Sequence, residues 1–191
     1  MDILVIGNSG REHALIWKLK KSNLVNKIYC APGNPGISQY AECIPIRINQ
    51  IKELIEFAKT KKIGFTIVGP EEPLVLGIVD EFQKKDLKIF GPNKESSKLE
   101  GSKTYAKKLM NQFGIPTGKY KEFDDYDEAL EYVKKSKLPI VVKADGLASG
   151  KGVVIAESFE MARNALDKCF LQDFFGEYGR KVIICLLYTS P

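Results

Sequence analysis

The sequence predicts an α/β protein in two parts: a parallel-sheet unit over residues 1–100, and then an incomplete α+β unit over residues 101–191. Two observations support this division. Short apolar runs alternate with amphipathic helical stretches in the first part, which is typical of a parallel sheet with helices on both faces. After residue 100 the order changes to strand, helix, two strands and helix.

The strands of the first part are short runs of buried type, expected at Ile3–Ile6, Lys27–Ala31, Phe65–Val68 and Lys88–Phe90. Helices are expected between them at Arg11–Lys20, Gln50–Lys62 and Leu74–Lys85. The second of these is the clearest, because its apolar residues recur at i, i+3, i+4 and i+7. Ligands of such sheets bind beyond the carboxyl ends of the strands, where this sequence places its glycine-rich breaks.

In the second part, Ser102 is a suitable cap for a helix that runs to Gln112, with Gly114 ending it. The elements expected after it are a strand at Lys119–Phe123, a helix at Tyr126–Lys135, a β-hairpin, a helix at Ser158–Leu171 and a last strand from Lys181.

The loop of the hairpin, K-A-D-G-L-A-S-G-K-G at 143–152, lies between the runs Pro139–Val142 and Val153–Ala156. Glycines let backbone N–H groups approach an anion closely, and lysines add mobile positive charge. The spacing is not that of a Walker loop, which continues into a helix. A flap over a polyphosphate is therefore predicted, the alternative being a surface hairpin with solubilising lysines.

Three loops in the first part leave strand ends, at Gly7–Arg11, Ala31–Gly36 and Gly69–Pro73. The first pairs a helix N-terminus with an arginine, which suits an anion. The second offers an amide and the third offers carboxylates for hydroxyls or an amine. Together they predict a pocket for a phosphorylated sugar, the alternative for each loop being a tight turn that binds no ligand.

Composition favours a cytoplasmic protein that binds neither nucleic acid nor membrane. The chain is 44% hydrophobic and 28% charged, and its 29 basic and 24 acidic residues give a net charge of +5. Most lysines alternate with acids along helices, which indicates solvated faces. The four cysteines lack C-x-x-C spacing, so neither a zinc site nor a disulfide framework is expected. The single histidine, His13, is expected to have a local structural role.

Seven motifs occur in one order along the chain: G-N-S-G-R-E-H-A-L (7–15), A-P-G-N-P-G (31–36), V-G-P-E-E-P-L-V (68–75), I-F-G-P (89–92), L-E-G-S-K (99–103), G-I-P-T (114–117) and V-K-A-D-G-L-A-S-G-K-G-V (142–153). With them the sequence resembles the phosphoribosylamine–glycine ligases of the ATP-grasp superfamily, from Met1 to about Ile183. The Arg-Glu-His at 11–13 separates it from biotin carboxylase and carboxyaminoimidazole ribonucleotide synthetase.

The resemblance implies a Rossmann-like, phosphoribosylamine-binding domain over 1–100 and a partial ATP-grasp domain over 101–191. It implies purine biosynthesis: glycine takes the γ-phosphate of ATP, and the amine of 5-phosphoribosylamine attacks glycyl phosphate to give glycinamide ribonucleotide. Lys143 and Lys151 would be catalytic. The implied ATP-binding residues are Lys103, Lys143, Asp145, Gly146, Ser149, Gly150, Lys151 and Gly152. The implied substrate-binding residues are Gly7, Asn8, Ser9, Gly10, Arg11, Gly33, Asn34 and Glu71.

The end of the chain departs from the family pattern. Cys185 and Leu186 occupy the place of a glutamate pair, and residues 184–191 do not match the family by inspection. The glutamate and asparagine that bind Mg²⁺ (or Mn²⁺) in the family are expected beyond this length, so no metal ligand is expected in the chain. We therefore expect an N-terminal fragment, monomeric and inactive by itself.

Two other functions compete with this interpretation. The first is a non-catalytic module that binds nucleotides or phosphosugars. The second is the dinucleotide-binding domain of a dehydrogenase. It requires the second glycine of G-x-G and an acidic residue at the end of the second strand, where Ala31 and Pro32 stand instead.

Overall fold

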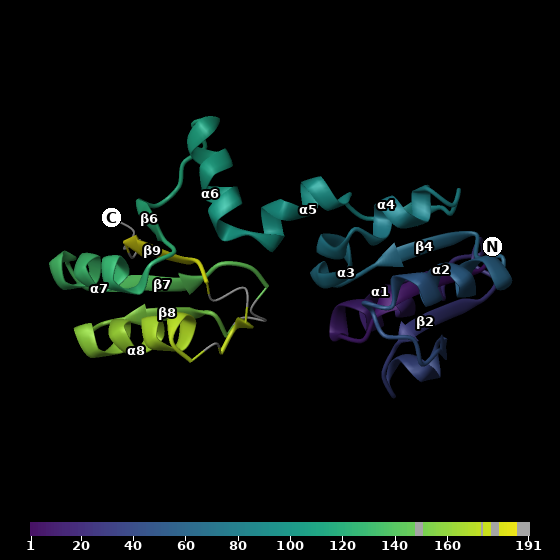
Figure 1. Cartoon of the computed structure of the whole chain (residues 1–191). Coiled ribbons are helices and arrows are strands. Elements are labelled where there is room, and N and C mark those ends of the chain that lie inside the picture. Colours follow the sequence, from purple (N-terminus) through teal and green to yellow (C-terminus); the bar gives the residue numbers. More distant parts are fainter. Residues whose placement is uncertain (148–150, 173, 177–179, 187–191) are drawn as a thin grey trace. The chain divides into compact units, whose positions relative to one another are not determined.

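The computed structural model describes residues 1–147, 151–172, 174–176 and 180–186. The chain divides into two compact units, Met1–Lys98 and Leu99–Pro191, which are called unit 1 and unit 2 below (Figure 1). No helix of the described ranges is both long enough and apolar enough to cross a bilayer.

Unit 1 contains a parallel sheet, as predicted, and the sheet has five strands in the order β3-β2-β1-β4-β5. Its strands are β1 (Ile3–Gly7), β2 (Ile28–Pro32), β3 (Glu42–Cys43), β4 (Phe65–Val68) and β5 (Ile89–Phe90). β1 lies in the middle of the sheet. The chain adds β2 and β3 on one side of β1 and then crosses over to add β4 and β5 on the other side. In open parallel sheets this reversal of strand order marks the crevice where ligands bind.

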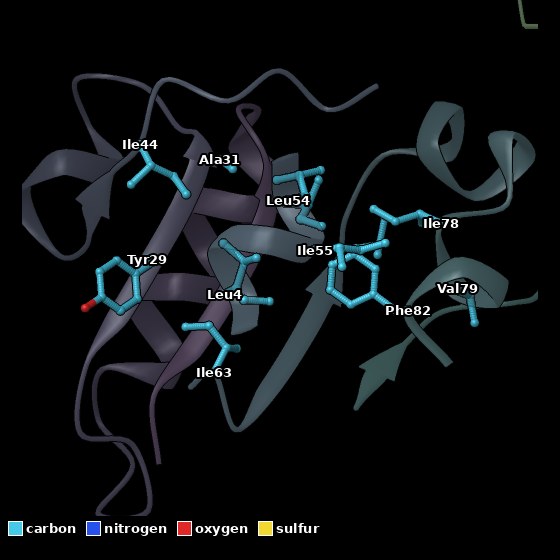
Figure 2. Packing of buried hydrophobic residues seen from close by; sticks show 13 residues of the cluster. Leu4, Tyr29, Ala31, Ile44, Leu54, Ile55, Ile63, Ile78, Val79 and Phe82 are labelled. Carbon is cyan, nitrogen blue, oxygen red and sulfur yellow. The ribbon is translucent and has the colours of Figure 1, made fainter. Parts of the chain in front are cut away.

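Helices cover both faces of this sheet because β1 is apolar at every position. Leu4 and Ile6 pack against α2 (Ile51–Thr60) and α4 (Ile78–Gln83), while Ile3 and Val5 pack on the side of α1 (Gly10–Leu19). Figure 2 shows Leu4, Ile55 and Phe82 in the first of these clusters. A continuous apolar run is the expected sequence of a strand buried on both faces.

The helix predicted at Leu74–Lys85 is wrong in its extent, because it is two short helices. Helix α3 (Glu71–Leu76) ends at Gly77, whose φ of 92° is left-handed, and α4 starts directly afterwards. Glycine adopts this conformation at no steric cost, so it ends helices readily. A short 3-10 helix, η1 (Ile37–Gln39), and the two-residue β3 were not predicted.

Unit 2 is the expected α+β unit, with an antiparallel sheet in the order β6-β9-β7-β8. Its strands are β6 (Tyr120–Phe123), β7 (Ile140–Ala144), β8 (Val153–Ala156) and β9 (Val182–Leu186). Helices α7 (Tyr126–Lys135) and α8 (Phe159–Phe170) bury one face of this sheet. The predicted helix after Ser102 is α6 (Lys103–Gln112), and α5 (Lys94–Gly101), which was not predicted, precedes it.

The last strand, β9, lies inside the sheet of unit 2. It pairs with β6 on one side and β7 on the other, and Ile183 and Ile184 are buried on opposite faces. Its hydrogen-bond ladders therefore join β6 to the β7–β8 hairpin.

Candidate functional site

The turn between β1 and α1 closes with hydrogen bonds from its own residues. Ser9 is the N-cap of α1, and its hydroxyl oxygen accepts from the backbone N–H of Arg11 at 3.2 Å. The Glu12 carboxylate reaches back and accepts from the backbone N–H of Ser9 at 2.7 Å. This is a capping box, in which donors at the helix start are satisfied within the chain.

Glu12 was not among the predicted site residues, although it lies beneath two of the predicted loops. Its side chain is only 1% exposed, and Oε1 has no hydrogen-bond partner in the described part of the chain. A Cβ atom on Gly7 would lie 2.5 Å from Glu12 Cδ, and one on Gly69 would lie 2.5 Å from the same atom. Glycine is therefore required at both positions by the Glu12 side chain between them. The spacing Ser9-x-x-Glu12 was the available sequence signal.

The loop after β2 is joined to the β1–α1 turn. The backbone N–H of Gly33 donates to the carbonyl of Gly7 at 3.1 Å, and the Asn34 amide donates to the carbonyl of Asn8 at 2.8 Å. Asn34 Oδ1 accepts from the backbone N–H of Ile37 at 2.9 Å. The Asn34 amide thus connects the two loops, whereas the sequence predicted a ligand-binding role for it.

Cys30, Cys43 and His13 contact these loops or the residues next to them. Burial raises the pKa of the Cys30 thiol to about 12, with further increases from Cys43 and Glu12, and the thiol donates to the Gly7 carbonyl at 3.3 Å. All four cysteines are free. His13 packs its ring against Tyr40 at a centroid distance of 5.6 Å, in keeping with the local structural role expected for it.

Arg11 and Glu71 form the exposed rim of this region. Arg11 Nη2 lies 3.3 Å from Glu71 Oε2, and the two side chains are 70% and 38% exposed. An exposed pair of this kind contributes little to stability, so both groups are free to exchange partners. The contacts of Gly7, Asn8, Arg11, Gly33, Asn34 and Glu71 bring the predicted substrate-binding residues, with Ser9 and Gly10 in the same turn, to one edge of the sheet.

In unit 2 the predicted hairpin is present, with Lys143 opposite Val153 in the β7–β8 ladder. The backbone N–H of Ala144 donates to the Gly152 carbonyl at 2.8 Å, which closes the base of the loop. Gly146 has a φ of 95°, a conformation that favours glycine, while Lys151 is exposed. Ser149 and Gly150 lie outside the described residues.

Asp145, predicted to bind ATP, is engaged in capping α6. Its carboxylate accepts from the Ser102 hydroxyl at 3.0 Å and from the backbone N–H groups of Thr104 and Gly146 at 3.1 Å each. The start of α6 is therefore tied to the base of the hairpin loop by a residue more than 40 positions away in sequence.

Lys103 is held at the same place. Its ammonium group donates to the Gly146 carbonyl at 2.7 Å. Burial lowers the pKa of Lys103, as does the nearby charge of Lys143, while Asp145 acts in the opposite direction. The ammonium groups of Lys103 and Lys143 are close enough to repel each other. A bound anion would offset both the desolvation of Lys103 and this repulsion.

The described side chains contain no group of three or more His, Cys, Asp or Glu residues suited to a metal ion.

A cavity of about 280 Å³ lies on the α8 side of the sheet and is lined by Val142, Val154, Cys169 and Phe175, with Lys151 and Lys168 also contributing. Since Lys143 neighbours Val142 in β7, its side chain belongs to the opposite face. The cavity therefore does not include Lys143, although Lys151 and Gly152 of the predicted flap line it.

We expect Gly69→Ala to destabilise unit 1 by about 1–3 kcal/mol, because the new methyl group collides with Glu12. Gly69 lies outside the left-handed region, so the cost should be steric. In a Glu12→Ala background, which removes the colliding atoms, the same substitution should cost less than about 0.5 kcal/mol. Urea unfolding of the four proteins measures this coupling, and equal costs in both backgrounds would contradict it.

We expect Asp145→Ala to destabilise unit 2 by about 1–3 kcal/mol, because buried donors of α6 and the loop lose their acceptor. Asp125→Ala is the matched control, since Asp125 caps α7 through the single backbone N–H of Glu128. That loss should cost about 1 kcal/mol. Thermal and urea unfolding compare the two variants, and the account fails if Asp145→Ala is the milder one.

Comparison with known proteins identifies the family. Residues 1–100 match the model described as phosphoribosylglycinamide synthetase, N domain, and residues 101–187 match the ATP-grasp (A) domain of the same synthetase. The second match extends past Ile183, where the resemblance by inspection ended. The chain is 53% identical to the phosphoribosylamine–glycine ligase of Caldanaerobacter subterraneus and 51% identical to that of Halalkalibacterium halodurans, each over 96% of this chain. It spans 44% and 43% of those proteins.

Solved structures agree with this assignment. The phosphoribosylamine–glycine ligase of Thermotoga maritima superposes with a TM-score of 0.77 at 29% identity, over all of this chain and 45% of that one. Biotin carboxylase of Campylobacter jejuni gives a TM-score of 0.75 at 18% identity, over 99% of this chain and 46% of that one, and it shows the shared fold alone. The chain belongs to the phosphoribosylglycinamide synthetase family, whose curated relatives are phosphoribosylamine–glycine ligases of the ATP-grasp type.

Proposed function

We propose that this chain takes part in the ATP-dependent ligation of glycine to 5-phosphoribosylamine, which gives glycinamide ribonucleotide through glycyl phosphate in purine biosynthesis. In this proposal unit 1 binds the phosphoribosylamine and unit 2 binds the ATP phosphates. The observation that carries it is the pair Lys103 and Lys143 at the base of the β7–β8 loop, in a chain 53% identical to a named ligase.

The lysines supply the charge that phosphoryl transfer requires. Catalysis of this reaction type consists mostly of positioning the phosphates and neutralising their charge. The Lys103 ammonium group donates to the Gly146 carbonyl, and Lys143 lies in β7 one residue before the strand ends, so both lysines extend from ordered backbone. Exposed Lys151 and the loop glycines complete the proposed flap over the phosphates.

In unit 1 the proposed ligand contacts are the exposed ones. Arg11 is a planar donor suited to a phosphate, and the Glu71 carboxylate accepts from sugar hydroxyls or an amine. Binding would exchange their mutual contact for contacts with the ligand. Gly7, Gly33 and Asn34 are proposed to shape this surface through the loop-to-loop hydrogen bonds.

A divalent metal accompanies ADP in the structure of Hydrogenobacter thermophilus 2-oxoglutarate carboxylase, a neighbour in fold. The described residues of this chain provide no cluster that fits such an ion. We further propose a cytoplasmic monomer.

A non-catalytic binding module is less well supported. The relatives at 53% and 51% identity are both named as ligases, and the identity extends over 96% of this chain. The dehydrogenase alternative has no support at the end of β2, where the Ala31–Pro32 peptide precedes Gly33.

The proposal is tested by replacing the corresponding segment of the Caldanaerobacter ligase with residues 1–186 of this chain and measuring glycine-dependent ADP release. We expect an active chimaera. Lys143→Met should lower kcat/KM by about 100-fold or more, because it removes charge stabilisation at the transferring phosphates. Exposed Lys137→Met, the control, should change it less than about twofold. A folded but inactive chimaera, or equal effects of the two substitutions, would contradict the proposal.

A further inference from the structure

The crevice at the carboxyl ends of β1 and β4 is filled by Glu12. Ile6 pairs with Val68 in the ladder of these strands, so Gly7 and Gly69 follow at neighbouring positions. The Glu12 side chain lies against both glycines and is 1% exposed. In parallel sheets of this strand order, phosphate groups commonly occupy this crevice against the N-terminus of the first helix.

Two backbone donors that would attract phosphate to such a turn are already used within this chain. The backbone N–H of Ser9 donates to Glu12 Oε2, and that of Arg11 donates to the Ser9 hydroxyl. The positive end of the α1 dipole faces a carboxylate of its own first turn. A phosphate here would meet these two occupied donors and a buried carboxylate, one oxygen of which has no hydrogen-bond partner among the described residues.

We propose that Glu12 is a specificity-determining residue, whose buried carboxylate closes the β1–β4 crevice to phosphate groups. The loops above it are left to the parts of a ligand that carry no negative charge and donate hydrogen bonds, such as hydroxyls or an amine. Steric filling and charge act together: the side chain occupies the space between Gly7 and Gly69 and places a like charge beside any incoming phosphate.

A closed crevice would fix the orientation of a ligand in the proposed sugar site, and in that respect the inference rests on the proposed function. A phosphorylated amino sugar would lie with its hydroxyls or amine over the Gly7–Gly69 crevice and its phosphate outside that crevice. The exposed Arg11 guanidinium, which leaves the turn toward Glu71, is a donor outside the crevice.

The test uses inorganic phosphate as the probe, at constant ionic strength, with the ¹⁵N-labelled 191-residue chain. The amide signals of residues 7–12 report on the turn. Three proteins are compared: wild type, Glu12→Gln, which keeps the shape and removes the charge, and Glu53→Gln. Glu53 is the matched control because it holds the same third position in α2 but is exposed.

We expect no saturable shift of these amides in wild type or Glu53→Gln. In Glu12→Gln they should saturate, with at least about a tenfold gain in phosphate affinity. Equal phosphate affinity in wild type and Glu12→Gln overturns the inference, as does an equal gain in Glu53→Gln. If Glu12→Gln fails to fold, wild type titrated with sulfate decides: saturable shifts at residues 7–12 overturn the inference and their absence supports it.

A separate titration with ribose 5-phosphate keeps the two proposals distinguishable. If wild type does not bind this sugar phosphate at all, the proposed substrate site of unit 1 fails, while the phosphate result on Glu12 stands. If wild type binds it and the sugar shifts the amides of residues 7–12 in the same pattern as free phosphate shifts them in Glu12→Gln, the proposed site survives and the inference fails.

Discussion

In each unit, a carboxylate that accepts hydrogen bonds from backbone N–H groups at the start of a helix fixes the glycine-rich loops of that unit's candidate site. Glu12 does this for α1 from within its own first turn, and it also separates Gly7 from Gly69. Asp145 does it for α6 from the end of β7, and it also accepts from Gly146. The loops of each site are thus positioned by hydrogen bonds to a carboxylate. Gly7 and Gly69 are required because the Glu12 side chain lies close to them, and Gly146 is favoured because its backbone is left-handed.

The two sites differ in the charge that they present. The edge of the unit 1 sheet combines the buried carboxylate of Glu12 with an exposed Arg11–Glu71 pair. The charge of the unit 2 site comes from Lys103 of α6, Lys143 of β7 and Lys151 of the β7–β8 loop, while the Asp145 carboxylate is engaged in capping α6. Carboxylates suit hydroxyls and amines, and ammonium groups suit phosphates. This contrast matches the division between a sugar-amine substrate and ATP in the proposed reaction.

Much of this arrangement could be predicted from the sequence. The apolar runs at Ile3 and Phe65 have the length of buried strands, and glycines after them indicate loops at the ligand-binding edge. What the sequence did not reveal depends on tertiary contact. Asp145 caps a helix that begins 42 residues earlier, at Lys103, and the role of Glu12 depends on Gly69 in the loop after β4. Gly77 was readable as a break but lay within a plausible helical pattern.

The central claim, that the lysines around the β7–β8 loop hold ATP phosphates, is tested most directly by lysine footprinting of the active chimaera. Methylation of each lysine is measured by mass spectrometry with and without saturating ATP. The account predicts that ATP protects Lys103, Lys143 and Lys151, while the exposed Lys52 and Lys137 react equally in both conditions. Unchanged reactivity of Lys103 and Lys143 at saturating ATP would contradict it.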